Sequence, residues 1–261
     1  MMPNRILDEF LHRLTLANQA VLLLDYDGTL APFRVERDKA FPYEGVRELL
    51  TSIRRDTKTR LIIVSGRAID DLLPLLSLTP PPEIWGCHGW EKLEEDGQRQ
   101  AVNLPDEARV GLQEGLMWVK HEGLENYCEK KTASLAIHWR GLPDHKIEEL
   151  RGKVNNGFRL IAENYCLQIH PFNGGLELRC PGESKGTVVK SILAGLSLDE
   201  PIAFLGDDLT DEDGFEAIKG RGIGILVNNK TRPTHADLQL KSPEDLISFL
   251  KTWRDKVPKM K

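Results

Sequence analysis

Cysteine is scarce in this sequence, and its spacing excludes two classes of protein. The 261 residues contain four cysteines, Cys87, Cys128, Cys166 and Cys180, and none of them forms a Cys-x-x-Cys pair. A small disulfide-stapled fold is therefore disfavoured, as is a zinc site built on closely spaced Cys or His ligands. We expect the four cysteines to be structural thiols.

Long apolar runs and an excess of basic residues are also missing. No stretch approaches the ~20 apolar residues that span a bilayer, and the polar N-terminal residues lack a signal-peptide pattern. The net charge of -5 and the absence of a basic tract argue against binding to nucleic acid or to an anionic membrane. We therefore expect a cytoplasmic protein with neither of these partners.

Two aspartates follow the first strongly apolar stretch of the chain. Val21–Leu24 is expected to be a strand buried on both faces, as in a parallel sheet, and it leads into Asp25-Tyr26-Asp27-Gly28. Asp25 and Asp27 would repel each other unless a cation lies between them or one of them holds a proton. Because Asp-Gly is also common turn chemistry, this motif alone does not separate an aspartate nucleophile from a simple turn.

A second apolar strand, Ile202–Leu205, is followed by five carboxylates within residues 207–213. A calcium-binding EF-hand is excluded by register, because Gly214 at its sixth position would place an apolar residue first and a glycine twelfth. Asp207 and Asp208 at the strand tip suit a hard cation such as Mg²⁺. The later acids fit the first turn of a solvated helix.

Two shorter motifs also follow or precede regular elements. Ser65-Gly66-Arg67 comes directly after the apolar strand Leu61–Val64, where a hydroxyl and backbone N–H groups suit a phosphate oxygen. Ser65 fits a helix N-cap equally well. Lys185 lies in the first turn of the expected helix Ser184–Leu196, where its charge opposes the helix dipole, so an anion would explain its position.

The order of elements predicts an α/β fold with an insertion. Apolar strands alternate with helices over residues 20–87 and again from about residue 176, which predicts a doubly wound parallel-sheet core. Between these regions the pattern helix-strand-strand occurs twice, which is typical of a small α+β unit. We predict a core of residues 1–103 and 175–261 interrupted by residues 104–174. The elements expected in the insertion are helices at Asp106–His121 and Pro143–Asn155 and strands at Glu125–Lys131, Ser134–Arg140, Phe158–Glu163 and Tyr165–His170.

The motifs occur in a recognisable order along the chain. Asp25-Tyr26-Asp27-Gly28-Thr29, Ser65-Gly66-Arg67, Lys185 and Gly206-Asp207-Asp208 resemble the four motifs of the haloacid dehalogenase (HAD) superfamily of phosphohydrolases. The sequence is similar, more narrowly, to the trehalose-6-phosphate phosphatase family. The segments that carry this closer resemblance are Gly206–Glu212, His88-Gly89, Ser134–Arg140 and Leu176–Arg179.

The resemblance implies an HAD-like fold in which the inserted α+β unit is a cap that closes over the site. It implies Asp25 as a nucleophile that forms an aspartyl-phosphate, and Asp27 as the acid and base. It also implies that Ser65, Lys185 and the backbone N–H groups near Asp27 and Gly66 hold phosphoryl oxygens. An aspartate is already ionised at neutral pH at its reference pKa of about 3.9, so such a nucleophile needs no activating base.

The resemblance further implies Mg²⁺ as the cofactor. The implied metal-binding groups are the Asp25 carboxylate, the Asp27 backbone carbonyl and the Asp207 carboxylate, with Asp208 acting through water. The cation would offset the repulsion between the aspartate and a phosphate dianion.

Seven residues are candidates for binding the substrate, by the same resemblance. They are Gly66, Arg67, His88, Glu129, Lys131, Arg140 and Glu177. Glu129 and Lys131 alternate along a strand and equally fit a solvated face, and His88 equally fits a turn or core position.

The implied reaction is hydrolysis of trehalose 6-phosphate, a step of trehalose biosynthesis, and the enzyme that makes trehalose 6-phosphate is the implied partner. Three alternatives share the same motifs: a phosphatase for another sugar phosphate, such as sucrose phosphate or mannosyl-3-phosphoglycerate, a sugar phosphomutase, and a non-catalytic binding module. The presence of both Asp25 and Asp27 argues against the non-catalytic module.

Overall fold

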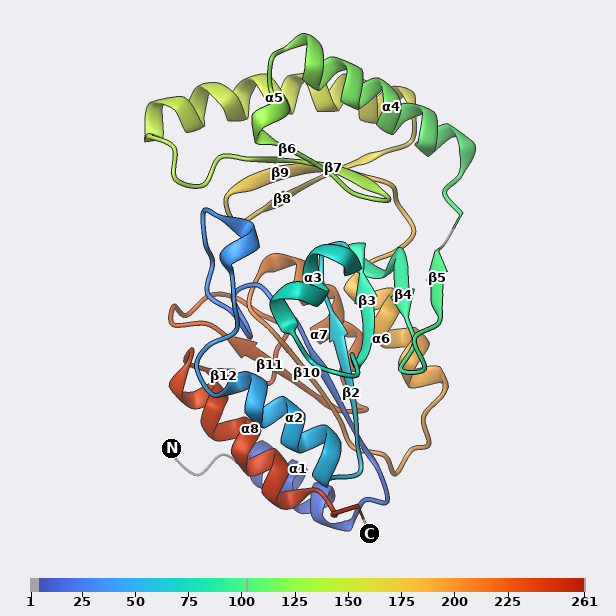
Figure 1. The fold of residues 1–261 in the computed structure, drawn as a ribbon, viewed down its shortest axis with the longest axis vertical. Helices are drawn as coiled ribbons and strands as arrows, with labels where there is room; N and C mark the ends of the chain where they lie inside the picture. Colours follow the sequence, from blue (N-terminus) through green and yellow to red (C-terminus); the bar gives the residue numbers. More distant parts are fainter. Residues whose placement is uncertain (1–4, 102, 261) are drawn as a thin grey trace. The chain divides into compact units, whose positions relative to one another are not determined.

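The computed structural model describes residues 5–101 and 103–260, which form two compact units (Figure 1). The core joins the residues up to Arg99 with those from Ser184 onward, and the insert comprises residues 100–183. Within the described residues, no helix combines the length and apolar character that crossing a membrane requires.

An eight-stranded sheet forms the centre of the core, in the order β12-β11-β10-β1-β2-β3-β4-β5. The pairs from β12 through β3 are parallel and β3 pairs with β4 antiparallel, which confirms the predicted α/β fold. The strands are β1 (Ala20–Leu24), β2 (Thr59–Val64), β3 (Glu83–Gly86), β4 (Glu91–Leu93), β5 (Arg99–Ala101), β10 (Ile202–Gly206), β11 (Ile223–Val227) and β12 (Leu238–Leu240).

Helices cover both faces of this sheet because β1 is apolar on both sides. Leu22 and Leu24 belong to the hydrophobic cluster under α1, α2, α3 and α8, and Val21 and Leu23 belong to the cluster under α6 and α7. In Figure 1, α1, α2 and α8 lie side by side. The helices are α1 (Arg5–Leu16), α2 (Val46–Asp56), α3 (Ile69–Leu76), α6 (Lys185–Ala194), α7 (Glu212–Ile218) and α8 (Glu244–Lys256).

The insert is an antiparallel four-stranded sheet, in the order β6-β7-β9-β8, with two helices on one face (Figure 1). Leu135 and Leu178 point towards α4, where a Cβ atom on Gly115 would lie 2.8 Å from the first and 3.1 Å from the second. The elements are α4 (Asp106–His121), β6 (Cys128–Lys130), β7 (Ser134–His138), α5 (Asp144–Asn164), β8 (Gln168–Phe172) and β9 (Gly175–Arg179).

Four short 3₁₀ helices also occur in the described chain: η1 (Arg37–Lys39), η2 (Cys87–Gly89), η3 (Glu125–Tyr127) and η4 (Leu209–Asp211). Two of them, η2 and η4, lie next to strands β3 and β10 at the edge of the core sheet where the acids occur.

The predicted strand at Phe158–Glu163 is wrong, because α5 continues without a break to Asn164. Asn155-Asn156-Gly157 has the composition of a helix end. Gly157, however, lies against α4, where a Cβ atom would come within 2.1 Å of the Trp118 ring, and Phe158 packs on the same indole. Tertiary packing therefore overrides the local signal.

The structure also places the second boundary differently from our prediction between residues 174 and 175. β9 pairs with β7, with Leu176 opposite Ile137, and so belongs to the sheet of the insert and not to the core. The apolar-polar alternation of Leu176–Arg179 fits a half-buried antiparallel strand as well as a core strand, and only the pairing separates the two.

Candidate functional site

An acidic cluster lies at the carboxyl ends of the central core strands. Asp25 directly follows β1 and Asp207 directly follows β10, which pair in parallel, so both side chains reach the same edge of the sheet. Asp25, Asp207 and Asp211 offer carboxylate oxygens that all lie within 4.8 Å of one another, and all three residues are buried.

Lys185 supplies the positive charge of this cluster. Its Nζ atom lies 2.6 Å from Asp25 Oδ1 and 2.6 Å from Asp211 Oδ1, and the lysine is itself buried. Ser184 caps α6 through hydrogen bonds from the Gly186 and Thr187 backbone, which fixes the first turn that carries the lysine. The lysine that opposed the helix dipole therefore pairs with two carboxylates.

The pKa values of Asp25 and Asp207 are raised although Lys185 lies beside them, because the charge of one lysine does not offset three buried acids. Burial raises the pKa of Asp25 to about 7 against the lowering effect of Lys185, and Asp211 raises it further. Burial and the charges of Asp25 and Asp211 hold the pKa of Asp207 well above its usual range. Burial alone would lower the pKa of Lys185, but Asp211 and Asp25 outweigh it and raise that pKa.

A divalent cation fits this set of groups. Three buried carboxylates and one ammonium leave an excess of two negative charges when all are ionised, and a hard cation held by oxygen ligands would compensate that charge. The buried aspartates are therefore consistent with a metal site in the core.

The turn after β1 requires glycine at residue 28. Its φ angle is +84°, and a Cβ atom there would lie 2.1 Å from Asp207 Oδ2. The Leu30 and Ala31 N–H groups both donate to the Tyr26 carbonyl, and the Thr29 hydroxyl donates to Asp25 Oδ2 at 3.0 Å. The chain thereby brings the aspartates after β1 and β10 together.

Asp211 is the residue of this cluster that the sequence analysis missed. Its Oδ2 atom accepts hydrogen bonds from the Asp207 and Asp208 backbone N–H groups, each at 3.0 Å. The Asp208 side chain instead accepts the Leu209 N–H at the start of η4 and is not part of the three-carboxylate cluster. The spacing of four residues between Asp207 and Asp211 was the available signal.

Ser65 and Gly66 lie at the end of β2 in the same unit. Ser65 is buried, and its hydroxyl accepts the Arg67 backbone N–H at 3.2 Å. Gly66 lies against His88, because a Cβ atom on the glycine would be 2.7 Å from the imidazole. His88 is buried at a φ of +60°, and its N–H donates to the Ser65 carbonyl. His88 therefore contacts both Ser65 and Gly66, and its contact with substrate stays a prediction.

Arg67 contacts an aspartate of the first motif. Its Nε and Nη2 atoms donate to the two carboxylate oxygens of Asp27, each at 2.6 Å, and its Nη1 donates to the Arg37 carbonyl at 3.0 Å. The guanidinium carbon lies 5.7 Å from the centroid of the Tyr26 ring. Arg67 therefore has an aspartate partner that the sequence analysis did not predict, and its contact with substrate stays a prediction.

A polar network covers one face of the insert sheet. Glu177 accepts hydrogen bonds from Lys131 Nζ at 2.8 Å and from the Ser134 hydroxyl at 2.6 Å. Glu129 lies 3.7 Å from Lys131 and 2.9 Å from His138 Nε2. Three predicted substrate-binding residues, Glu129, Lys131 and Glu177, are therefore brought together.

Arg140, Ser134 and His138 also belong to the insert. Arg140 donates to the Asn173 carbonyl at the β8–β9 turn. Ser134 and His138 belong to the network, although the sequence analysis did not select them. The signal for both was their place on β7, whose alternate residues share one face with Glu129 and Glu177.

Solved structures with the same fold belong to HAD-like hydrolases and their relatives. The C-terminal domain of Candida albicans trehalose-6-phosphate phosphatase superposes with a TM-score of 0.82 at 20% identity, covering 98% of both chains. A haloacid dehalogenase-like hydrolase from B. subtilis superposes with a TM-score of 0.63 at 16% identity, covering 89% of this chain and 99% of the other. These likenesses define the fold class.

Sequence comparison defines the family within that class. The chain belongs to the trehalose-phosphatase family, whose pattern matches residues 23–244. It is 28% identical to the probable trehalose-phosphate phosphatase 3 of Oryza sativa subsp. japonica, over 89% of this chain and 69% of the relative. It is also 28% identical to an uncharacterized glycosyl hydrolase of Mycobacterium tuberculosis, over 92% of this chain but 18% of that longer protein.

Proposed function

We propose that this chain hydrolyses trehalose 6-phosphate to trehalose and inorganic phosphate, with Mg²⁺ as its cofactor. The observation that carries the proposal is the buried cluster of Asp25, Asp207, Asp211 and Lys185 at the carboxyl edge of the core sheet, in a chain of the trehalose-phosphatase family. Buried acids with raised pKa values beside a buried ammonium are typical of a functional site.

In the first step, a carboxylate oxygen of Asp25 attacks phosphorus and the bond from phosphorus to the sugar oxygen breaks. Asp27 gives its proton to the leaving sugar oxygen, which produces trehalose and an aspartyl-phosphate. Proton transfer of this kind contributes on the order of 10²–10⁴ in rate. Because both oxygens of Asp27 accept hydrogen bonds from Arg67, one of these two contacts has to open before Asp27 can carry a proton, while the other keeps the side chain in place.

In the second step, Asp27 takes a proton from water while the water oxygen attacks phosphorus. The bond from phosphorus to Asp25 breaks, and inorganic phosphate leaves with the carboxylate restored. Ser65, the Gly66 N–H and Lys185 are the proposed donors to phosphoryl oxygens. Lys185 already spans Asp25 and Asp211, so its charge is fixed in place before substrate arrives.

Mg²⁺ would be held by the carboxylates of Asp25, Asp207 and Asp211, together with the Asp27 backbone carbonyl. When bound, it would offset the negative charge that these acids and the phosphate share. In this proposal Asp211 takes the place that the sequence analysis gave to Asp208, because Asp208 caps η4 instead.

The insert is the proposed cap of the enzyme, and its polar network would supply groups for sugar hydroxyls. Glu129 and Glu177 offer acceptors and Lys131 a donor, all on one face of the insert sheet. We further propose a cytoplasmic location, with the enzyme that makes trehalose 6-phosphate as a functional partner.

Phosphate release from a panel of phosphorylated sugars, with Mg²⁺ and then with excess chelator, tests the proposal. We expect a strong preference for trehalose 6-phosphate, loss of release with chelator, and loss in Asp25→Asn. Asp213→Asn, at an exposed acid of α7, is the matched control and should retain activity. Phosphate release from other sugar phosphates but not from trehalose 6-phosphate would contradict the proposed substrate. An isomerised product would indicate a mutase. No phosphate release from any of the sugars would contradict the proposal that the chain is a phosphatase.

A further inference from the structure

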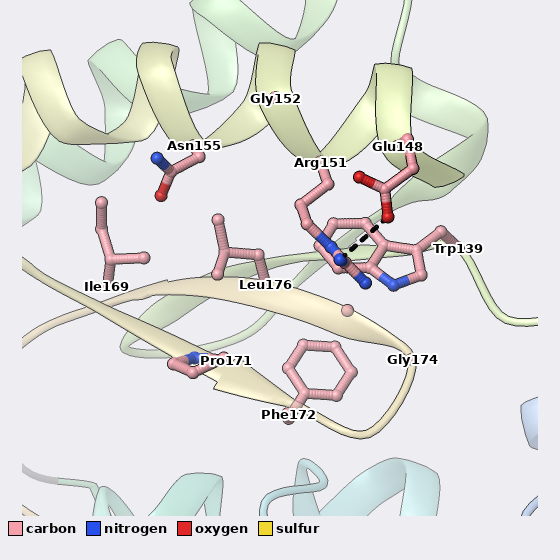
Figure 2. Close-up of a pocket in the computed structure, with 11 residues that line it drawn as sticks. Trp139, Glu148, Arg151, Gly152, Asn155, Ile169, Pro171, Phe172, Gly174 and Leu176 are labelled. Atoms are coloured by element: carbon pink, nitrogen blue, oxygen red, sulfur yellow. Dashed lines mark hydrogen bonds and ion pairs between the residues drawn. The ribbon is translucent and has the colours of Figure 1, made fainter. Parts of the chain in front are cut away.

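The insert contains a groove that the proposed reaction does not use. It has a volume of about 770 Å³ and lies between α5 and the β8–β9 hairpin (Figure 2). This volume falls in the range of small-molecule sites. Its lining residues all belong to the insert and lie between Trp139 and Leu176 in the sequence.

One side of the groove is apolar and the other is polar. Ile169 and Leu176 project from the hairpin strands, and Trp139 closes one end beneath Arg151, whose guanidinium carbon lies 5.7 Å from the indole centroid. In Figure 2 the Asn155 side chain extends from α5 towards the hairpin. A ligand here would meet hydrocarbon on one face and hydrogen-bonding groups on the other.

The polar side carries no net charge. Arg151 Nη1 lies 3.1 Å from Glu148 Oε1, so the only two charged side chains among the described lining residues pair with each other (Figure 2). The Asn155 amide, which can both donate and accept, has no hydrogen-bond partner among residues 5–101 and 103–260. These groups suit an uncharged ligand rich in hydroxyls better than a phosphate or a cation.

Two glycines of α5 differ in their surroundings. Gly157 has a packing reason, because a Cβ atom there would collide with Trp118. Gly152 also lines the groove, yet a Cβ atom there would meet no heavy atom within 4 Å. Because there is room for a methyl group at residue 152, this position can be substituted without disturbing the packing of α5.

We propose that this groove binds a neutral sugar, with the C–H face of a pyranose ring against Ile169 and Leu176 and its hydroxyls on Asn155, Arg151 and Glu148. The site is separate from the polar network of Glu129, Lys131 and Glu177, because Leu176 and Glu177 are adjacent on β9 and point to opposite faces. Trehalose is the first probe because it is the product of the proposed function.

Sugar titration followed by NMR of the indole N–H of Trp139 tests this site, with the signal assigned by its loss in Trp139→Phe. Trehalose, maltose and glucose are added to the intact chain, and glycerol serves as the non-sugar control. We expect a saturable shift with at least one sugar and none with glycerol. Absence of a saturable shift with every sugar would overturn the proposal.

Two substitutions at one exposed position make the test specific. Gly152→Phe directs a ring into the groove and should weaken the sugar by about tenfold or more, whereas Gly152→Ala adds a single methyl group and should retain binding. Equal affinity in both variants would show that the sugar binds elsewhere and would overturn the site. Phosphate release, assayed in parallel, should be unchanged in both, and its failure in all forms would contradict the proposed function but leave the groove standing.

Discussion

At the scale of single residues, Arg67 has a partner that was not predicted. The family resemblance implied that Arg67 contacts substrate, and in the structure its buried guanidinium also holds both oxygens of Asp27. In the proposed reaction, a side chain so engaged would act by positioning the acid. The sequence could not reveal this pairing, because the two residues are forty positions apart and follow different strands, β1 and β2.

We expect Arg67→Met to lower kcat with little change in KM, because Asp27 would lose its position while the groups that bind substrate remain. The loss should reach roughly 10²-fold, within the usual contribution of general acid–base catalysis. Arg67→Lys should recover part of kcat, since it restores the charge but not the two-point contact. Arg55→Lys, at an exposed arginine, is the control. A rise in KM at constant kcat would instead assign Arg67 to substrate binding.

Asp25 should make the metal-free protein less stable as the pH rises. Its folded pKa is raised to about 7 from 3.8, so between these values the folded state holds a proton that the unfolded chain has lost. The stabilisation that Asp25 contributes is therefore fully present below about pH 4 and falls as the pH rises to 7. Above pH 7 the free energy of unfolding no longer changes because of this group. The total loss is roughly 4 kcal/mol, at ~1.4 kcal/mol for each pH unit.

Denaturant unfolding in chelator, compared between the wild type and Asp25→Asn, measures this contribution. The asparagine variant does not titrate at this position, so the difference in free energy of unfolding should change in its favour between pH 4 and pH 7. A difference that stays constant over this interval would mean that Asp25 is ionised throughout.

At the scale of elements, the two glycines of α5 give opposite predictions. Gly152→Ala should raise the free energy of unfolding by about 0.5–1 kcal/mol, because alanine favours the helix and its methyl group meets no neighbour. Gly157→Ala should lower it, because the new Cβ atom would press on the Trp118 ring. Thermal unfolding of the wild type and the two variants tests this prediction, with a higher Tm expected for Gly152→Ala and a lower Tm for Gly157→Ala. Equal shifts of the Tm in one direction would contradict it.

Some helices and strands could be predicted from the sequence and others could not. The strands that end at Asp25, Ser65 and Asp207 were predictable, because an apolar run followed by polar residues marks a buried strand and its carboxyl end. The continuation of α5 through Gly157 was not, since it depends on a partner helix that local composition does not show. Asp211 was missed for a related reason: a helix-start position explained it without its contacts to Lys185 and Asp207.

At the scale of the whole molecule, Mg²⁺ should stabilise the folded chain, because the unfolded chain has no preformed site. At a concentration of 100 times its Kd the gain would be about 2.7 kcal/mol. Calorimetry should show a higher Tm with Mg²⁺ in the wild type and no rise in Asp207→Asn, which lacks a member of the cluster. Asp208→Asn should retain the rise, because its side chain caps η4. If Mg²⁺ also failed to raise the Tm of Asp208→Asn, Asp208 would be a metal ligand after all.

The central position of β1 has a consequence for how the chain is made. β1 pairs on one side with β2, which leaves the ribosome soon after it, and on the other with β10, which begins roughly 180 residues later, beyond the whole insert. At about 5–20 residues per second, the nascent chain holds β1 with one open edge for roughly 10–40 s. Because every side chain of that strand is apolar, its open edge exposes the nascent chain to aggregation during this interval.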